Sequence, residues 1–114
     1  MIYLESNSCD AFFNFALEDY AMHELSIAEE YFIFWRTRPT LMIGQYQNAR
    51  QEINTEFAKK NDIKIVRRVT GGGTIYTDME GWQFSFIFKN AGTKDIDFHT
   101  FTLPIINALR SIGV

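Results

Sequence analysis

The stretch RRVTGGGTIYTD, residues 67–78, holds the most distinctive loop of the chain and decides the fold around it. Two arginines precede three consecutive glycines, and a short β-like run follows. Because glycine has no Cβ, its backbone amides can approach a ligand closely and its φ can be positive. Successive N–H groups in such a loop can form an anion-binding concavity, and guanidinium groups add forked donors for phosphate or carboxylate. The stretch therefore predicts a site for an anionic small molecule.

The two commonest phosphate-binding loops do not fit this stretch. A Walker A loop has Gly-Lys-Ser/Thr after its glycines, and a Rossmann fingerprint has a further glycine and a following helix. Residues 74–77 instead have the pattern of a strand. An ordinary turn or bulge needs one or two glycines, so three in a row favour a ligand loop, with a structural turn as the alternative.

The hydrophobic pattern on either side predicts strands more often than helices. The strands expected are residues 2–4, 31–35, 40–43, 63–66, 74–77 and 82–88. The unbroken apolar run 31–35 indicates a strand covered on both faces. A short polar turn, residues 36–39, separates it from the strand 40–43, which predicts a hairpin.

Three helices are expected between and after these strands. The first covers about residues 10–25, with Phe13, Ala16, Leu17 and Tyr20 at helical spacing and Glu18, Asp19 and Glu24 off that stripe. The second runs from Thr55, as its cap, through Lys60, and the third follows Phe98, with Pro104 early in it and Gly113 at its end. Residues 45–54 and 90–97 are expected to be loops. Paired strands without intervening helices predict an α+β fold with a mixed, largely antiparallel sheet and flanking helices.

Composition narrows the function classes. The 114 residues, 46% hydrophobic, suit one domain or part of one, and a net charge of −3 argues against nucleic-acid binding by bulk charge. The single Cys9 cannot form an internal disulfide and is expected to be an ordinary thiol. No apolar run approaches the roughly 18 residues of a membrane span, and the N-terminus lacks the pattern of a signal peptide. The expected location is the cytoplasm.

The glycine stretch also carries a family resemblance. Residues 67–78 resemble the Arg-Arg-x-x-Gly-Gly-Gly-x-x-x-His-Asp signature of lipoate–protein ligases. Residues 14–19 resemble the Asn-x-Ala-x-Glu-Glu helix near that family's start. Phe34-Trp35-Arg36, followed by Ile43-Gly44-x-x-Gln47-Asn48, resembles its Trp-Arg…Ile-Gly-x-x-Gln-Asn hairpin and loop. The matches are collinear and span nearly the whole chain.

The resemblance implies an α+β domain shared with biotin protein ligases and related to class II aminoacyl-tRNA synthetase cores. It implies activation of lipoate by ATP, with Mg²⁺, to lipoyl-AMP. Transfer to a lysine of a lipoyl carrier domain would follow, in a 2-oxoacid dehydrogenase complex or the glycine cleavage H protein. Fixed arginines and preorganised backbone donors suit this chemistry, because two anions must meet and developing charge must be stabilised.

The resemblance also assigns residues, none of them to a metal site. Those expected to contact ATP or the acyl-adenylate are Arg68, Gly73, Thr74, Ile75 and Tyr76. Those expected to shape the loop or the lipoate pocket are Arg67, Thr70, Gly71 and Gly72. Trp35 is expected either to wall an acyl tunnel or to be plain core.

One position within the glycine stretch departs from the family pattern. Thr77 stands where the pattern usually has histidine, and a hydroxyl cannot carry charge near neutral pH. His23 and His99 do not replace that histidine by sequence position. Any role that rests on the imidazole is therefore in doubt for this chain.

The essential lysine of the family is the second departure. In family members it follows the helix that matches residues 98–114, so it is expected beyond Val114, and no catalytic residue is identified within the chain. The lysines present here do not match it by position: Lys59, Lys60, Lys64, Lys89 and Lys94. Residues 1–114 are therefore expected to be the N-terminal portion of one catalytic domain, incomplete and not self-sufficient.

The sequence leaves open two alternatives to a lipoate ligase. An octanoyl- or lipoyl-transferase of the same superfamily would use a cysteine thioester and no ATP, and Cys9 is not placed to be its nucleophile. A non-catalytic binding or assembly module is the other. Biotin ligation fits less well, because the Trp35-Arg36 and Ile43–Asn48 segments resemble the lipoate branch.

Overall fold

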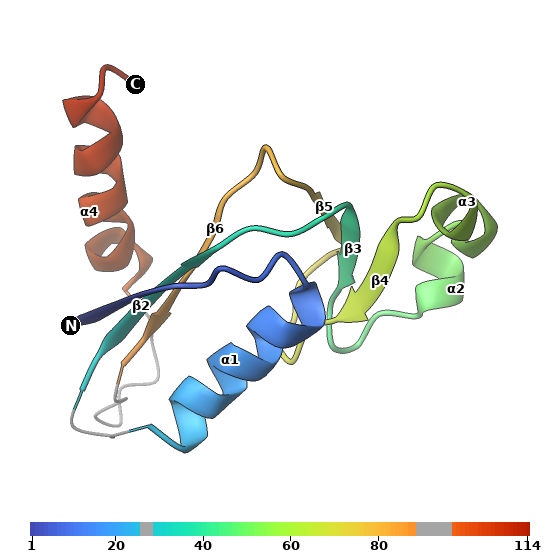
Figure 1. Ribbon diagram of the computed structural model, residues 1–114, viewed down its shortest axis with the longest axis horizontal. Coiled ribbons are helices and arrows are strands. Elements are labelled where there is room, and N and C mark those ends of the chain that lie inside the picture. Colours follow the sequence, from blue (N-terminus) through green and yellow to red (C-terminus); the bar gives the residue numbers. More distant parts are fainter. Residues whose placement is uncertain (26–28, 89–96) are drawn as a thin grey trace.

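A computed structural model describes residues 1–25, 29–88 and 97–114 of the chain (Figure 1). The elements within these residues are β1 (Ile2–Glu5), α1 (Ala11–His23), β2 (Tyr31–Trp35), β3 (Thr40–Ile43), α2 (Ala49–Glu52), α3 (Thr55–Lys60), β4 (Lys64–Arg67), β5 (Ile75–Thr77), β6 (Gln83–Ile87) and α4 (Phe98–Ser111). All six expected strands are confirmed, with ends shifted by no more than one residue. Most of the expected loop at 90–97 lies outside the described residues.

The strands form two three-stranded sheets, ordered β1-β2-β6 and β4-β3-β5. In each sheet the central strand has one parallel and one antiparallel neighbour. The α+β class and the mixed pairing are confirmed, although the pairings divide evenly between the two directions. In Figure 1, α2 and α3 lie beyond β4 at one end of the molecule, and α4 stands at the other.

The expected hairpin between β2 and β3 is wrong. β2 pairs with β1 and β6, whereas β3 pairs with β4 and β5, so the connection carries the chain from one sheet to the other. The physical reason lies in Thr37, which is fully buried and hydrogen-bonded to Thr77. A connection that passes through the interior cannot make the exposed reversal that a hairpin needs.

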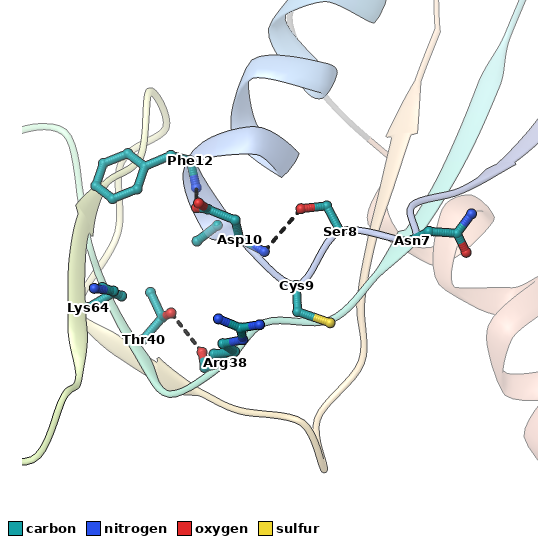
Figure 2. A pocket seen from close by; sticks show the side chains of 9 residues that line it. Asn7, Ser8, Cys9, Asp10, Phe12, Arg38, Thr40 and Lys64 are labelled. Carbon is teal, nitrogen blue, oxygen red and sulfur yellow. Dashed lines mark hydrogen bonds between the residues drawn. The ribbon is translucent and has the colours of Figure 1, made fainter.

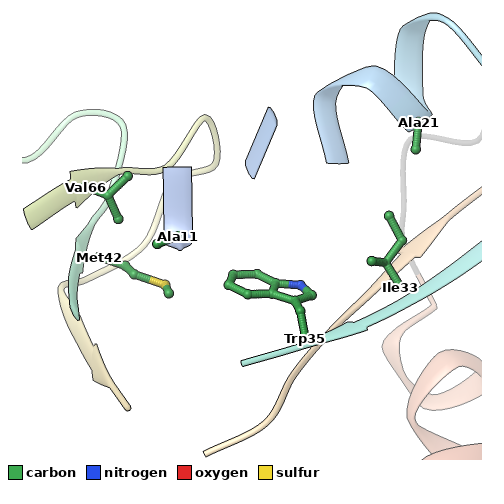
Figure 3. Close-up of a cluster of buried hydrophobic side chains, with 6 residues drawn as sticks. All are labelled: Ala11, Ala21, Ile33, Trp35, Met42 and Val66. Carbon is green, nitrogen blue, oxygen red and sulfur yellow. The ribbon is translucent and has the colours of Figure 1, made fainter. Parts of the chain in front are cut away.

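The main core lies between α1 and the two sheets. Figure 3 shows six of its buried side chains, with the Trp35 indole in the middle of the cluster: Ala11, Ala21, Ile33, Trp35, Met42 and Val66. Tyr31, Ile33 and Trp35 are buried on this face of β2, while Phe32 and Phe34 on the other face are half-buried. The strand is thus covered fully on one face, not on both.

The face of α1 that packs into this core only partly matches the expected one. Phe13 and Tyr20 are more than half exposed, whereas Ala11, Asn14 and Ala21 are buried. Leu17 of the expected stripe does pack against the core, together with Phe15. Glu18, expected off the stripe, is half-buried against the sheet.

The structure differs from the expected helices in residues 45–54 and at the start of α3. Residues 45–54 include the short helix α2, whose N-cap is Asn48. The N-cap of α3 is Asn54, whose side chain accepts from the Phe57 amide, and Thr55 is the first helical residue. Both caps are asparagines, whose side-chain oxygens satisfy amides of the first helical turn.

The last helix, α4, begins at Phe98 and ends at Ser111, close to where the sequence predicts. Gly113, with a φ of +87°, follows its end, and the amides of Gly113 and Val114 donate back to the carbonyls of Arg110 and Leu109. This pair of bonds closes a helix end at a glycine. Pro104 lies in the interior of α4, not early in it.

α4 makes its contact with the sheet through an aromatic side chain. Within the described chain no α4 residue is fully buried. The helix meets β6 through Phe101, whose ring lies 5.5 Å from that of Phe86. Val114, just past the end of α4, is exposed. The catalytic lysine is expected beyond Val114, so the described residues do not test that prediction.

Candidate functional site

The glycine loop crosses the end of β3. Because β4 and β5 lie on opposite sides of β3, residues 68–74 must pass over its carboxyl end to join them. Gly44, the next residue after β3, meets the loop there. A Cβ built on Gly44 would lie 2.0 Å from the Gly72 carbonyl oxygen, so only glycine fits at position 44. The loop and the Gly44–Gln47 segment therefore form one interlocked unit.

Arg67 holds the Gly44–Gln47 side of this unit. Its Nη1 donates to three backbone carbonyls, at 2.9 Å to Gly44, 3.1 Å to Gln45 and 2.8 Å to Gln47. The Gln45 amide in turn donates to the Thr70 carbonyl at 2.9 Å. The guanidinium bends the Gly44–Gln47 backbone around itself, and Thr70 joins that backbone to the glycine loop.

Arg68 holds the glycine loop from inside. Its Nη2 donates to the carbonyls of Gly71 at 3.1 Å and Gly73 at 2.8 Å, and its Nη1 donates to Met42 at 3.2 Å. Three of the five guanidinium N–H groups thus meet backbone carbonyls. Gly72 has a φ of +97°, a conformation that favours glycine, between these contacts. The positive charge of Arg68 is fixed at the centre of the loop.

The other two glycines of the loop differ from Gly44 and Gly72. A Cβ built on Gly71 or Gly73 would meet no atom of the described chain within 4 Å. Neither residue has a positive φ. Neither crowding nor backbone conformation therefore demands glycine at these two positions. An open, Cβ-free surface beside a fixed guanidinium is what a closely approaching anion would use.

Gln47 connects the two halves of the unit, and sequence reasoning did not single it out. Its Oε1 accepts from the Gly44 amide at 2.9 Å and from the Thr74 hydroxyl at 3.0 Å. The Ile-Gly-x-x-Gln-Asn pattern contained this residue, but only the folded loop shows what it bonds. Thr74 is thereby fixed at the point where the loop enters β5.

Ile75 and Tyr76 continue from the loop along β5 and are about half exposed. Partial desolvation and then the nearby Asp78 charge raise the pKa of the Tyr76 phenol above its ordinary value. Thr77, the next residue, is buried, and its hydroxyl meets that of Thr37. The site residues expected from sequence are thus contiguous in space from Arg67 to Tyr76.

Trp35 lies apart from the loop residues, in the main core. Its Nε1 donates to the Ser85 hydroxyl at 3.5 Å, and that hydroxyl donates to the Glu18 carboxylate. Burial raises the pKa of Glu18, and the hydrogen bonds from Ser85 and Trp35 partly offset that rise. Sequence reasoning missed Glu18 because its helical position pointed to solvent. The plain-core alternative for Trp35 describes its contacts, while its role in an acyl tunnel stays a prediction.

A large cavity in the described part of the chain does not coincide with the glycine loop. It holds about 530 Å³ and is lined by Asn7, Ser8, Cys9, Asp10, Ala11, Phe12, Arg38, Thr40 and Lys64 (Figure 2). Thr40 and Lys64 begin the parallel strands β3 and β4, whereas Gly44 and Arg68 follow their ends. The cavity therefore lies at the opposite end of that sheet. The hydrogen-bonded geometry of the glycine loop is the better guide to chemistry than cavity size.

Neither histidine lies in the loop. His23 ends α1, with Nδ1 3.3 Å from an Asp19 carboxylate oxygen, and exposed His99 is near the start of α4. Within residues 1–25, 29–88 and 97–114, no three His, Cys, Asp or Glu side chains gather closely enough to hold a metal ion. No helix in these ranges is long and apolar enough to cross a bilayer.

Comparison with known proteins identifies the family. Residues 10–114 match the lipoyl protein ligase A/B catalytic domain. The chain belongs to this family. It is similar to the lipoate–protein ligase LplJ of Bacillus subtilis, with 38% identity over 100% of this chain and 35% of the relative. The chain thus spans about a third of that relative's length.

Two solved structures share the fold of the chain. LipL1 of P. falciparum, in complex with lipoate, has a TM-score of 0.86 and 27% identity over 96% of this chain and 35% of its own. The bi-partite lipoate protein ligase of Thermoplasma acidophilum, from a lipoylation system with its E2 lipoyl domain, has a TM-score of 0.82. It has 27% identity over 98% of this chain and 45% of its own. Both likenesses confirm the lipoate ligase fold expected from the sequence.

Proposed function

We propose that this chain forms the adenylate-binding part of an ATP-dependent lipoate–protein ligase. The observation that carries the proposal is the glycine loop, in which Arg68 is fixed by three carbonyls while Gly71 and Gly73 stay open. Such a loop is preorganised for an anion before any ligand arrives. Membership of the lipoyl protein ligase A/B family and the similarity to LplJ support lipoate as the acyl group.

The proposed reaction has two steps. A lipoate carboxylate oxygen attacks the α-phosphorus of ATP, forming lipoyl-AMP and releasing pyrophosphate. A lysine amine of the carrier then attacks the acyl carbonyl, forming the amide and releasing AMP. Mg²⁺ enters with ATP, bound to its phosphates, as is usual for this ion.

The residues of the loop take separate parts in this proposal. Arg68 faces the nucleotide or acyl phosphate and offsets its negative charge. The backbone groups of Gly73, Thr74, Ile75 and Tyr76 line the adenylate, and fixed donors of this kind are worth most where water is excluded. Arg67, Thr70 and Gly72 keep the loop in shape, Gly71 leaves open space for the approaching anion, and Trp35 closes the acyl end. The catalytic lysine of the family, expected beyond Val114, is not among these residues.

The proposal extends to partners and location. Lipoyl carrier domains of 2-oxoacid dehydrogenase complexes or the glycine cleavage H protein would be the acceptors, in the cytoplasm. Residues 1–114 would form the N-terminal portion of one catalytic domain. The bi-partite archaeal ligase, reported with its E2 lipoyl domain, supports the acceptor class.

The test is product analysis with the full polypeptide in which this sequence occurs. Incubation with lipoate, ATP and Mg²⁺ should yield lipoyl-AMP and pyrophosphate, detected by mass spectrometry, before any carrier is added. Acyl transfer to a carrier domain without ATP would contradict the ligase and favour the transferase. Absence of both reactions in a folded sample would favour a binding or assembly role.

A further inference from the structure

Two threonine hydroxyls meet where the chain passes between the two sheets. Thr37 lies in the connection from β2 to β3, and Thr77 is the last residue of β5. Their Oγ1 atoms are 2.8 Å apart, and the residues are 0% and 7% exposed. Each hydroxyl therefore satisfies the other away from bulk water, as buried polar groups require.

Neighbouring groups fasten the same two connections together. The Arg36 Nη1 donates to the Met79 carbonyl at 3.3 Å, and the guanidinium carbon lies 4.2 Å from the centre of the Trp82 ring. The Asn14 side-chain amide of α1 donates to the Arg36 carbonyl at 3.3 Å. The link from β2 to β3 and the link from β5 to β6 are thus joined at this point.

The strand that Thr77 ends depends strongly on this junction. β5 is three residues long, and in the described chain it pairs with β3 alone, through Ile75, Tyr76 and Thr77. Its other two residues are those that the proposed function places against the acyl-adenylate. Any shift of Thr77 therefore moves Ile75 and Tyr76 relative to the glycine loop.

We infer that Thr37 and Thr77 form a positioning pair that sets where β5 meets the acyl-adenylate, an inference that rests on the proposed function. Two hydroxyl oxygens sit at hydrogen-bond distance, whereas two methyl groups need about 3.5–4.0 Å. Valine at both positions would push the two connections apart by about 1 Å. A misplacement of that size can lower a rate about 100-fold. The hydrogen bond between Thr37 and Thr77 thus sets the distance between the β2–β3 connection and the end of β5.

Valine variants can separate the effect of the pair on the position of β5 from its effect on the stability of the fold. A single Thr37→Val or Thr77→Val substitution leaves one buried hydroxyl without its partner, which destabilises the fold. The double substitution leaves neither hydroxyl without a partner, so it removes the penalty of an unpaired buried group that each single substitution carries. A pair with a merely structural role would regain activity together with stability in the double variant, whereas a positioning pair would regain stability alone.

The experiment uses the full polypeptide with five variants: Thr37→Val, Thr77→Val, the double valine variant, Thr77→Ser and Thr40→Val. Thr40→Val is the matched control, since Thr40 is buried and lies opposite Thr77 on β3, but among the described residues its hydroxyl bonds the nearby Arg38 carbonyl, at 2.7 Å, and not Thr77. The thermal unfolding temperature should fall in both single valine variants and in the control, and it should recover in the double variant. Lipoate-dependent exchange of pyrophosphate into ATP should fall at least tenfold in the double variant, with Thr77→Ser and Thr40→Val near wild type.

Amide hydrogen exchange of residues 74–77 decides the inference independently of activity. Exchange there should be faster in the double variant than in wild type or Thr40→Val, at equal global stability. Wild-type protection of β5 in the double variant, or recovery of its activity together with its stability, would overturn the inference. If the double variant does not fold, Thr77→Val must lose more activity than Thr40→Val. An inactive wild type would instead contradict the proposed function, while the exchange data still decide this inference.

Discussion

The two sheets of this chain are held by different chemistry. At the end of the β4-β3-β5 sheet, two guanidinium groups and one side-chain amide bond backbone atoms of two crossing segments. On the outer face of the β1-β2-β6 sheet, aromatic rings pack on one another, as Phe32 does on Phe86 with 4.9 Å between ring centres. Hydrogen bonds are more strictly directional than ring packing. Single substitutions should therefore have sharp effects in the first region and graded effects in the second.

Gly44→Ala should have the largest effect of any single change. Its Cβ would need the space of the Gly72 carbonyl, 2.0 Å away, so the two crossing segments must separate. Overpacking of this kind costs about 1–3 kcal/mol, and displacement of the loop should lower lipoyl-AMP formation about 100-fold. Thermal unfolding and lipoate-dependent pyrophosphate exchange measure the two effects. Wild-type activity in this variant would show that the interlock does not shape the site.

Gly71→Ala separates ligand binding from folding. The added Cβ meets no atom of the described chain within 4 Å, so stability should be unchanged or raised by up to about 1 kcal/mol. Affinity for a non-hydrolysable lipoyl-AMP analogue should fall at least about tenfold, or about 1.4 kcal/mol. Calorimetry measures the affinity. Gly81→Ala is the matched control, because it adds a Cβ with only ordinary contacts at a turn outside the loop. Equal affinities in the two variants would favour the structural turn.

These two predictions also show what the sequence could reveal. The strands beside the glycine loop were predictable, because alternation and β-branching around residues 63–66 and 74–77 are local signals. The Arg67 and Arg68 contacts were not, since they depend on where β3 ends. The β2–β3 hairpin failed because Thr37 is buried by residues distant in sequence, and the α1 face was only partly right because its orientation depends on contacts with both sheets. Gln47 and Glu18 were missed because their hydrogen-bond partners are distant in sequence.

Glu18 of α1 makes a directional contact with the β1-β2-β6 sheet, because it accepts a hydrogen bond from the Ser85 hydroxyl of β6. Burial raises its pKa in the folded protein, so folding favours the protonated carboxyl. The stability that this group supports is therefore fully present below its ordinary pKa and is lost as the pH rises through the raised value. Glu18→Gln should remove that loss and flatten the decline in unfolding temperature above about pH 4.5. Exposed Glu24→Gln is the control. An unchanged pH profile in Glu18→Gln would show that the carboxyl is not the source.

Phe84→Thr on the outer face should have the smallest effect. Phe84 is 42% exposed and packs beside Phe32 and Phe86, so its loss should lower stability by only about 1 kcal/mol. Binding of an apolar fluorescent dye should weaken, because less aromatic surface faces solvent. A stability loss above about 3 kcal/mol would mean that this face is packed as tightly as a core and would remove the contrast between the two sheets.

We expect the glycine loop, not the large cavity at the other end of its sheet, to receive the acyl-adenylate. Amide hydrogen exchange of the full polypeptide, with and without a non-hydrolysable lipoyl-AMP analogue, tests this claim most directly. The structure predicts that the strongest added protection falls on residues 70–76, with little change at residues 7–12. Protection concentrated around Cys9 and Lys64, with the loop unchanged, would contradict it.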